Sequence, residues 1–363
     1  MNHTKKSVIL LVAISAILSI AGCGNTQSTE KQSATQVNNQ QKRTITDSAG
    51  KKVEITTNVL RIADSWPAHN EVLAMLGGGD KIVATVHTPE SRPWLYKVNP
   101  SMNNAVNTFT PNLNIEELIK TKPDIAIVPV ADKNVDKISE VGIPVVQLTF
   151  TDFNSLKSCF LLTGDILGDV GKQKAQQYIS YLDSKLKMVT DVTSQIPQEN
   201  RPKVLHLTSL SPNIVDGGNT IIDAWIQAAG GVDAAGELPG SFKEVSMEQI
   251  LKWNPDVIIL GTGNTGLGAK NADLLKTDPQ WQKINAVKNG RVYVNPNGAF
   301  MWDRYGAEEA LEIQWAAKTL NPDKFTNLDM SQVTKDFYKT FLNYTLTDDE
   351  TNRILTGQNP AKS

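Results

Sequence analysis

The chain has 363 residues, of which 40% are hydrophobic and 20% charged, and its formal net charge is −2 at pH 7. This length is enough for one large or two medium domains with full cores. The near-neutral charge gives no electrostatic basis for nucleic-acid binding. Of the two cysteines, Cys23 belongs to a predicted membrane anchor, so Cys159 has no disulfide partner and is expected to be a small buried hydrophobe.

The first 23 residues have the order of a secretory signal: a basic start, an apolar run over 8–20, and small residues before Cys23. The pattern resembles a bacterial lipoprotein signal, so residues 1–22 are expected to be removed and Cys23 to be lipidated. An ordinary signal peptide with an incidental cysteine is the alternative. Residues 23–43 are polar and are interpreted as a disordered, lipid-anchored tether. The protein is therefore expected outside the cytoplasm, anchored to the outer face of the bacterial cell membrane or facing the periplasm.

Residues 44–170 alternate short apolar strands with helical segments, after a turn near Gly50 between two β-prone flanks. Strands separated by helices predict a parallel sheet, and hence an N-terminal α/β lobe. The expected strands cover 60–64, 82–86, 125–130 and 144–149, and the expected helices cover 68–76, 114–121, 134–140 and 154–168.

Residues 171–196 are predicted to form one long amphipathic helix, because apolar residues recur every three or four positions between 172 and 194. A second α/β run, residues 197–345, predicts a C-terminal lobe, and a helical tail over 346–363 closes the chain. The strands expected in this lobe cover 203–208, 257–260 and 291–294, and the helices cover 220–228, 246–252, 272–276 and 306–319.

The two predicted lobes contain a matching segment, because residues 114–128 align without gaps on residues 246–260. Each copy has an N-cap residue, a glutamate in the first helical turn (Glu116 or Glu248), a Pro-Asp break and a buried strand. Such connectors also recur by chance in α/β proteins. Their length and their placement on both sides of one long helix favour two Rossmann-like lobes joined by that helix, with a ligand cleft between them.

The order of lipoprotein cysteine, polar tether, lobe, long helix and second lobe resembles a family of ABC-transporter substrate-binding proteins whose lobes are joined by one rigid helix. Within that family, the chain is similar to the branch that binds iron–siderophore complexes, cobalamin or haem. The resemblance covers 44–340 and rests on the two Pro-Asp motifs and on residues 46–50, 71–77, 240–242 and 302–304.

The resemblance implies a binding protein that is not an enzyme, with an ABC permease and its ATPase as partners. It also implies that Glu116 and Glu248, one in each lobe, dock on permease arginines; the alternative is that they only complement the helix dipoles. The continuous helix between the lobes further predicts a monomer with little lobe motion.

Loops at the carboxyl ends of the predicted strands form the expected ligand site, because ligands of parallel α/β sheets bind there. These loops are rich in aromatic residues, Phe300 among them, and carry two arginines, which suits a large, partly apolar, anionic ligand. Any one of the aromatic residues is also compatible with a core position. The candidate ligand-binding residues are Trp66, His69, His87, Arg92, Trp94, Phe150, Phe242, Trp302, Arg304 and Tyr305, of which Trp66, Trp94, Trp302 and Arg304 are the strongest candidates because they lie in predicted loops.

Three histidines, His69, His87 and His206, could suggest a metal site. A bare zinc or manganese ion, however, needs about three histidines and a carboxylate converging on one point. His206 lies within a predicted strand, where a core histidine is expected. A ligand that is a metal chelate, with its own donor atoms, fits better. We therefore expect no intrinsic cofactor and no bare metal site, and we expect an iron(III) chelate such as a siderophore as the ligand, with cobalamin or haem as the alternative.

Enzymatic motifs are weak in this sequence. Residues 261–266 match GxGxxG, but the helix and the acidic residue of a dinucleotide site do not follow, so this segment is predicted to be a cleft loop. No GxSxG, P-loop or HExxH motif occurs, and the predicted loops hold no nucleophile–base grouping. A surface enzyme that uses the two-lobed cleft is therefore the weaker hypothesis, and a sensor or adhesin with the same fold remains open.

Overall fold

The computed structural model describes residues 41–261 and 268–361. This range leaves out the predicted signal sequence, Cys23 and most of the predicted tether. Of the GxGxxG segment it includes only Gly261. The described residues belong to a single compact unit, and two α/β lobes are distinguished within it. Among the described residues, no helix is both long enough and apolar enough to cross a membrane.

The first lobe is built on a five-stranded sheet whose strand order is β5-β4-β3-β6-β7, and all of its pairs are parallel. Parallel neighbours need crossover connections, which the helices of this lobe provide. The strands are β3 (Ile62–Asp64), β4 (Ile82–Thr85), β5 (Val106–Asn107), β6 (Ile125–Pro129) and β7 (Val145–Leu148), and the helices are α1 (His69–Leu73), α2 (Pro93–Val98), α3 (Ile115–Lys120), α4 (Val135–Glu140) and α5 (Phe153–Leu167).

An antiparallel hairpin of β1 (Lys42–Thr46) and β2 (Lys52–Thr56) precedes this sheet. Its turn docks on the edge strand β7, because the backbone N–H of Gln147 donates to Asp47 Oδ2 and the N–H of Ser48 donates to the Gln147 carbonyl. The hairpin therefore contacts an edge that would otherwise present unpaired backbone groups.

The second lobe contains a six-stranded mixed sheet of order β11-β9-β8-β12-β13, with β10 also paired to β8. Strands β8, β12 and β13 are parallel, as the sequence predicts, whereas β9 and β11 are antiparallel additions that the sequence analysis missed. The strands are β8 (Lys203–Leu210), β9 (Asn213–Val215), β10 (Val232–Asp233), β11 (Lys243–Glu244), β12 (Val257–Leu260) and β13 (Val292–Val294), and the helices are α7 (Ile221–Ala228), α8 (Met247–Trp253), α9 (Gly268–Thr277), α10 (Asn285–Lys288) and α11 (Glu309–Leu320).

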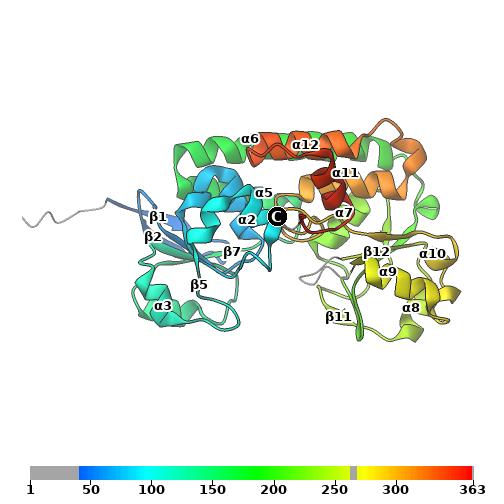
Figure 1. Cartoon of the computed structure of the whole chain (residues 1–363), viewed down its shortest axis with the longest axis horizontal. Coiled ribbons are helices and arrows are strands. Elements are labelled where there is room, and N and C mark those ends of the chain that lie inside the picture. The colour runs from blue at the N-terminus through cyan, green and yellow to red at the C-terminus, as the bar shows by residue number, and fades with distance from the viewer. Residues whose placement is uncertain (1–40, 262–267, 362–363) are drawn as a thin grey trace, which may run out of the picture. The chain divides into compact units, whose positions relative to one another are not determined.

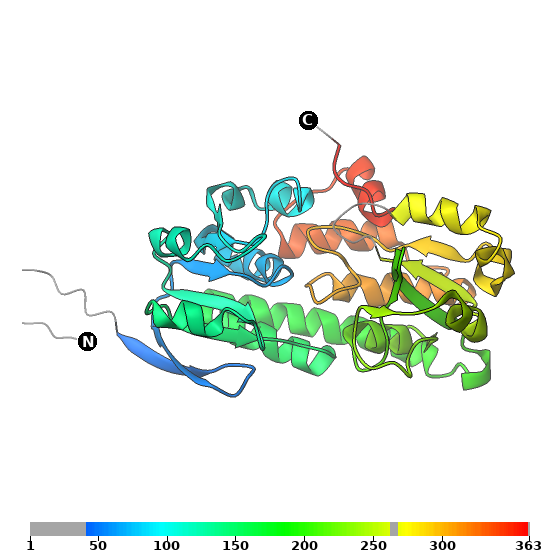
Figure 2. The same cartoon turned by 90° about the horizontal axis from the view of Figure 1, so that it is seen from below.

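One helix of 25 residues, α6 (Asp169–Thr193), runs along both lobes (Figures 1 and 2). It begins after Gly168, whose φ of 90° lies in the left-handed region that favours glycine. It packs on α5 of the first lobe and on α7 and α11 of the second. The amphipathic pattern predicted this helix to within a few residues at each end.

The C-terminal helices α12 (Met330–Phe341) and α13 (Asp348–Leu355) follow, and α12 lies against α11. The chain then returns to the first lobe, where the indole N–H of Trp94 donates to the Gln358 carbonyl at 2.9 Å. The predicted tail is thus packed against the lobe that is most distant from it in sequence.

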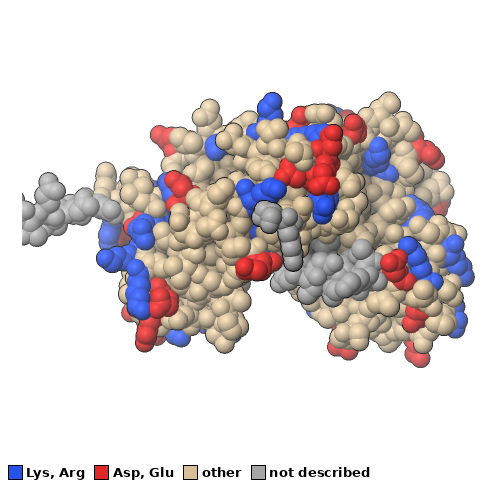
Figure 3. Space-filling view, viewed as in Figure 1, with Lys and Arg blue, Asp and Glu red and all other residues tan. Residues whose placement is uncertain are grey.

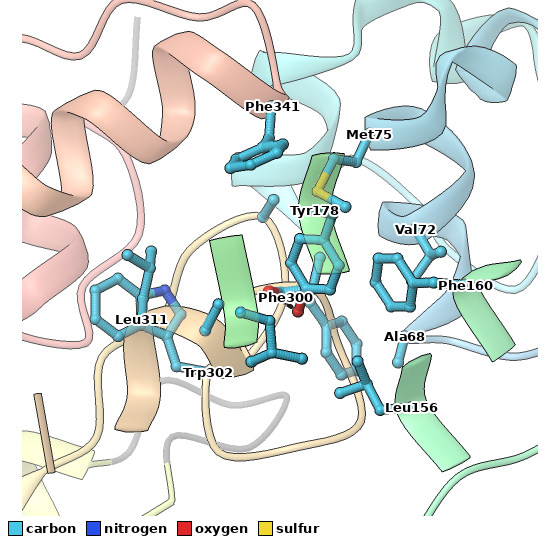
Figure 4. Packing of buried hydrophobic residues seen from close by; sticks show 14 of the residues in the cluster. Ala68, Val72, Met75, Leu156, Phe160, Tyr178, Phe300, Trp302, Leu311 and Phe341 are labelled. Atoms are coloured by element: carbon cyan, nitrogen blue, oxygen red, sulfur yellow. Dashed lines mark hydrogen bonds between the residues drawn. The ribbon is translucent and has the colours of Figure 1, made fainter. Parts of the chain in front are cut away.

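The main hydrophobic core crosses the boundary between the lobes (Figure 4). Tyr178 of α6 stacks on Phe160 of α5 with ring centroids 4.2 Å apart, and its hydroxyl donates to the Ala307 carbonyl of the second lobe at 2.8 Å. Trp302 and Leu311 belong to the same buried cluster. The lobes therefore share one packed interior at this junction, which opposes independent movement.

The internal repeat is reproduced in three dimensions. Asn114 and Ser246 are the N-caps of α3 and α8, and each side chain accepts the backbone N–H three residues later at 3.1 Å. The aspartates of the two Pro-Asp motifs also play equivalent parts. Asp124 Oδ2 accepts the Arg61 N–H at 2.8 Å, and Asp256 Oδ2 accepts the Lys203 N–H at 3.0 Å. Each aspartate thereby ties the start of one sheet strand to its neighbour.

Candidate functional site

A pocket of about 330 Å³ lies where the loops of the two lobes face each other. The face drawn in Figure 3 is indented between the lobes. The first-lobe wall comes from the segments that follow β3, β4 and β5, and the second-lobe wall comes from the residue before β11 and from the loop after β13. The lining residues are Trp66, Pro67, Ala68, Val86, His87, Ser91, Arg92 and Thr110 on the first wall, and Phe242, Phe300, Met301, Arg304 and Tyr305 on the second.

The second wall carries a buried ion pair between Arg304 and Asp216. Arg304 Nη1 also lies 3.4 Å from Asp216 Oδ1, and the guanidinium carbon sits 4.4 Å from the centroid of the Phe242 ring. The backbone N–H of Phe242 donates to the same Asp216 Oδ1 at 3.1 Å. Asp216 thus fixes both a cation and an exposed aromatic residue of the wall.

A second buried contact continues inward from Asp216. His206 Nδ1 lies 2.8 Å from Asp216 Oδ2, and His206 Nε2 lies 2.8 Å from Asp303 Oδ2. Burial alone would lower the pKa of His206, but hydrogen bonds to the two carboxylates raise it to about 9. His206 is therefore protonated at neutral pH and donates from both nitrogens.

The first wall carries Arg92 and His87. The Arg92 guanidinium carbon lies 4.7 Å from the Phe300 ring centroid, so a cation of the first lobe stacks on an aromatic residue of the second. His87 Nε2 donates to the Pro67 carbonyl at 2.8 Å. Burial, with a smaller contribution from nearby Arg92, lowers the pKa of His87 to about 4, so this histidine is neutral at neutral pH.

Six of the ten predicted ligand-binding residues line this pocket: Trp66, His87, Arg92, Phe242, Arg304 and Tyr305. Two of them, Phe242 and Tyr305, have positive φ angles of 58° and 45°, which are uncommon for aromatic residues. Backbone strain of this kind is concentrated at binding sites.

The structure corrects the prediction for Trp94 and Trp302, which are at most 1% exposed and do not line the pocket. Trp94 lies in helix α2, which the sequence analysis took for a loop, and its indole N–H points to the C-terminal segment. The indole N–H of Trp302 donates to Glu308 Oε1 at 2.9 Å. The indole N–H is the one polar group of each of these side chains, and its hydrogen bond inside the protein allows the whole ring to be buried.

The prediction is also corrected for His69 and Phe150, which lie behind the lining. His69 is buried between Asp64, 2.8 Å from its Nδ1, and Thr163, 2.9 Å from its Nε2. Phe150 is 1% exposed, and its ring centroid lies 5.4 Å from that of Trp66 and 5.6 Å from that of Tyr305. Both residues support pocket side chains from the core side.

Sequence reasoning missed Met301 and the two aspartates behind the second wall. Met301 precedes Trp302 in an irregular loop, and no periodicity tells which of the two side chains faces outward. Asp216 follows β9, a strand that was not expected. Nothing in the sequence singled out Asp216, whereas Asp303 lies in the 302–304 segment on which the family resemblance rests.

The expected docking glutamates, Glu116 and Glu248, are exposed in the first turns of α3 and α8. In Figure 1 both helices lie along the lower edge of the molecule, one in each lobe, on the side opposite α6. The repeat therefore presents two equivalent acidic positions on one side of the protein.

Within residues 41–261 and 268–361, no cluster of three or more His, Cys, Asp or Glu side chains is arranged to hold a metal ion. The three histidines considered from the sequence have other partners, and Cys159 is a free, buried thiol.

The chain is similar to known proteins both in sequence and in structure. The profile of a family described as periplasmic binding protein matches residues 66–299. The uncharacterised ABC transporter substrate-binding lipoprotein YvrC of Bacillus subtilis is 27% identical over 330 residues, which are 88% of this chain and 99% of that protein.

Two further relatives are named for different ligands. The molybdate-binding protein MolA of Haemophilus influenzae is 24% identical over 83% of this chain and 88% of its own length. The Fe(3+)-citrate-binding protein YfmC of Bacillus subtilis is 23% identical over 80% of this chain and 89% of its own length. Among solved structures, a periplasmic solute-binding protein of Veillonella parvula superposes with a TM-score of 0.73 at 31% identity, covering 87% of this chain and 97% of that one.

Proposed function

The chain belongs to the periplasmic binding protein family, and on that premise we propose that its pocket captures an anionic iron(III) chelate for an ABC importer. Members of this family are solute-binding proteins, and those similar to this chain serve ABC transporters. The open question is the cargo, because relatives of similar identity are named for ferric citrate and for molybdate.

The observation that carries the proposal is the pairing of Arg92 and Arg304, one on each wall, in a pocket with four aromatic side chains. Two guanidinium groups suit carboxylate or hydroxamate oxygens that project from opposite sides of a ligand. The aromatic surface supplies apolar contact but no hydrogen-bond donors along most of its area. This combination favours an organic chelate over a bare oxyanion, which needs donors on every side.

The size of the pocket supports a small chelate. At about 330 Å³ it lies near the lower end of the range for small-molecule sites. A citrate complex or a compact hydroxamate complex could be largely enclosed, whereas cobalamin or haem would remain mostly outside. Cobalamin and haem are therefore the weaker alternatives.

Titration of the purified protein tests the proposal, with tryptophan fluorescence as the signal because Trp66 lines the pocket. The probes are ferric citrate, a ferric hydroxamate siderophore, cyanocobalamin, haem and molybdate. Saturable quenching by an iron chelate is expected. Arg304→Ala should weaken its binding by about 1.5–3 kcal/mol, the value of a charge-assisted contact.

Arg291→Ala is the matched control, because Arg291 belongs to the same lobe but donates to the Leu320 carbonyl and does not line the pocket. It should leave the affinity unchanged. Saturable binding of molybdate alone, or of cobalamin or haem alone, would overturn the assignment to an iron chelate.

We also propose that Glu116 and Glu248 dock on cationic residues of the permease, and that Cys23 carries the lipid that holds the protein at the outer face of the membrane. The exposure of both glutamates and their equivalent places in the repeat support the first proposal. The signal-like sequence of residues 1–23 and the lipoprotein relative YvrC support the second. Metabolic labelling with radioactive palmitate, lost in Cys23→Ser, tests the anchor.

A further inference from the structure

Behind the second wall of the pocket, four buried side chains form a row of alternating charge: Asp303, His206, Asp216 and Arg304. His206 comes from β8, Asp216 directly follows β9, and the other two lie in the loop after β13. Only Arg304 at the end of the row reaches the pocket lining. The row therefore connects a histidine in the sheet to a cation that faces the ligand.

Asp216 is the shared member of the row. Its Oδ2 accepts from His206 Nδ1 and from Arg304 Nη2, and its Oδ1 accepts from the Phe242 N–H and from Arg304 Nη1. A carboxylate offers about four acceptor positions, so this one is fully used. Because Asp216 pairs with both His206 and Arg304, its single negative charge neutralises the charge of Arg304 only in part.

We propose, building on the function proposed above, that His206 is a positioning residue for ligand capture. Through Asp216 it orients Arg304 and keeps the positive charge of Arg304 available to an anionic group of the ligand. With His206 protonated, the row is neutral overall, as two carboxylates face two cations. Without that proton the row carries one net negative charge next to the pocket, which opposes an incoming anion.

In the described part of the chain, none of the other groups that face His206 is a cation, so none of them can supply the positive charge that His206 loses when it is deprotonated. Asp216 and Asp303 contact it directly, and the edge of the Trp225 ring packs on it with centroids 5.9 Å apart. The carboxyl groups of Glu312 and Asp233 lie within its electrostatic reach. Burial raises the pKa of Glu312 well above its ordinary value, so that group is protonated and uncharged at neutral pH. Burial also raises the pKa of Asp233, to about 7.

The sign of the pH dependence follows from the raised pKa of His206. Its stabilising charge is fully present below the ordinary histidine pKa of about 6.5 and is lost as the pH rises through about 9. The affinity for an anionic ligand should therefore fall between pH 8 and pH 10. A purely structural histidine would not give this profile.

Side-chain NMR of the purified protein provides the first test, because the sequence contains only four histidines. His206 should titrate near 9 and His87 near 4. The Hε–Nε signal of Arg304 should shift with the same midpoint as His206. A His206 midpoint below 7, or an Arg304 signal that does not follow it, would overturn the proposal.

The second test measures affinity for ferric citrate and for molybdate, two anionic probes, from pH 6.5 to 10. In the unmodified protein the affinity should fall about tenfold across the upper part of this range. His206→Gln should bind about tenfold more weakly at pH 7 and should lack the alkaline fall. Asp256→Asn is the control, since it changes a carboxyl of the same lobe that accepts the Lys203 N–H and makes no contact with His206 or Arg304, and it should follow the unmodified protein.

Unchanged affinity and an unchanged profile in His206→Gln would refute the role of this residue. If His206→Gln does not fold, the NMR titration and the profile of the unmodified protein decide the matter together. If neither anion nor any other probe binds, the proposed function fails, and the linked titration of His206 and Arg304 still decides whether the row acts as a unit.

Discussion

Glu71 of helix α1 gives the sharpest test of how the lobes are joined. Its side chain is fully buried and reaches into the second lobe, where Oε2 accepts the backbone N–H of Ala307 at 2.9 Å. Burial raises the pKa of Glu71 well above its ordinary value, and the neighbouring Glu308 raises it further. Burial also raises the pKa of Glu308. The pair therefore holds a proton at neutral pH, with Glu71 acting as a neutral acid.

Two substitutions separate the hydrogen bond from the charge. Glu71→Ala leaves the Ala307 N–H without an acceptor, which costs about 1–3 kcal/mol, and removes one buried methylene group worth about 0.8 kcal/mol. The expected loss of unfolding free energy is about 2–4 kcal/mol. Glu71→Gln keeps an acceptor for Ala307 and places an amide donor toward Glu308. It should stay within about 1 kcal/mol of the unmodified protein at pH 7.

The pH dependence adds a second criterion. A carboxyl group whose folded pKa is raised contributes stability that is present below its unfolded pKa and is lost as pH rises through the folded pKa. Each unit of the shift is worth about 1.4 kcal/mol. Alkaline pH should therefore destabilise the unmodified protein relative to Glu71→Gln.

Urea unfolding at pH 6, 7.5 and 9, followed by tryptophan fluorescence and circular dichroism, measures these differences. Glu117→Gln, which changes a surface glutamate of α3, is the control and should have little effect at any pH. If Glu71→Gln is as unstable as Glu71→Ala at pH 7.5, Glu71 is ionised in the folded protein and the reasoning fails.

Three further outcomes are expected. Gly298→Ala should prevent correct folding, because a Cβ there would lie 2.1 Å from Glu308 Oε1; recovery of soluble, native protein would contradict the packing described. Burial raises the pKa of the Cys159 thiol to about 12, so in a Cys23→Ser background a thiol reagent at pH 8 should label this residue only after denaturation. Glu116→Gln combined with Glu248→Gln should leave ligand affinity intact but reduce uptake by cells, and normal uptake would remove both residues from permease docking.

The fold was largely predictable because its signals are local. The strands of the parallel sheets are short apolar runs such as residues 125–128 and 257–260, buried on both faces. The helices that connect them start at recognisable caps such as Asn114 and Ser246. The strands β5, β9, β10 and β11 were missed; β5, β10 and β11 have only two residues each, which is too few to carry a pattern.

The pocket was predictable only as a set of loops. Arg92 lines it while Trp94, two residues later, is buried, because Pro93 starts a helix that turns the indole toward the C-terminal segment. A proline at the first helical position was the available signal for α2. Likewise, Met301 lines the pocket while the next residue, Trp302, is buried. Here the indole of Trp302 is directed inward by its hydrogen bond to Glu308, a partner that no local sequence pattern indicates.

The interior shared by both lobes also limits how this protein can be divided or recombined. A break at the end of α6 would leave each half with an uncovered apolar surface, and the C-terminal segment would be separated from Trp94, its contact in the other lobe. Neither lobe is therefore expected to fold when it is separated from the other. A chimaera with a relative should therefore fold only when the exchanged pieces are surface loops around the pocket, so changes of cargo are expected to arise by remodelling those loops while both lobes stay together.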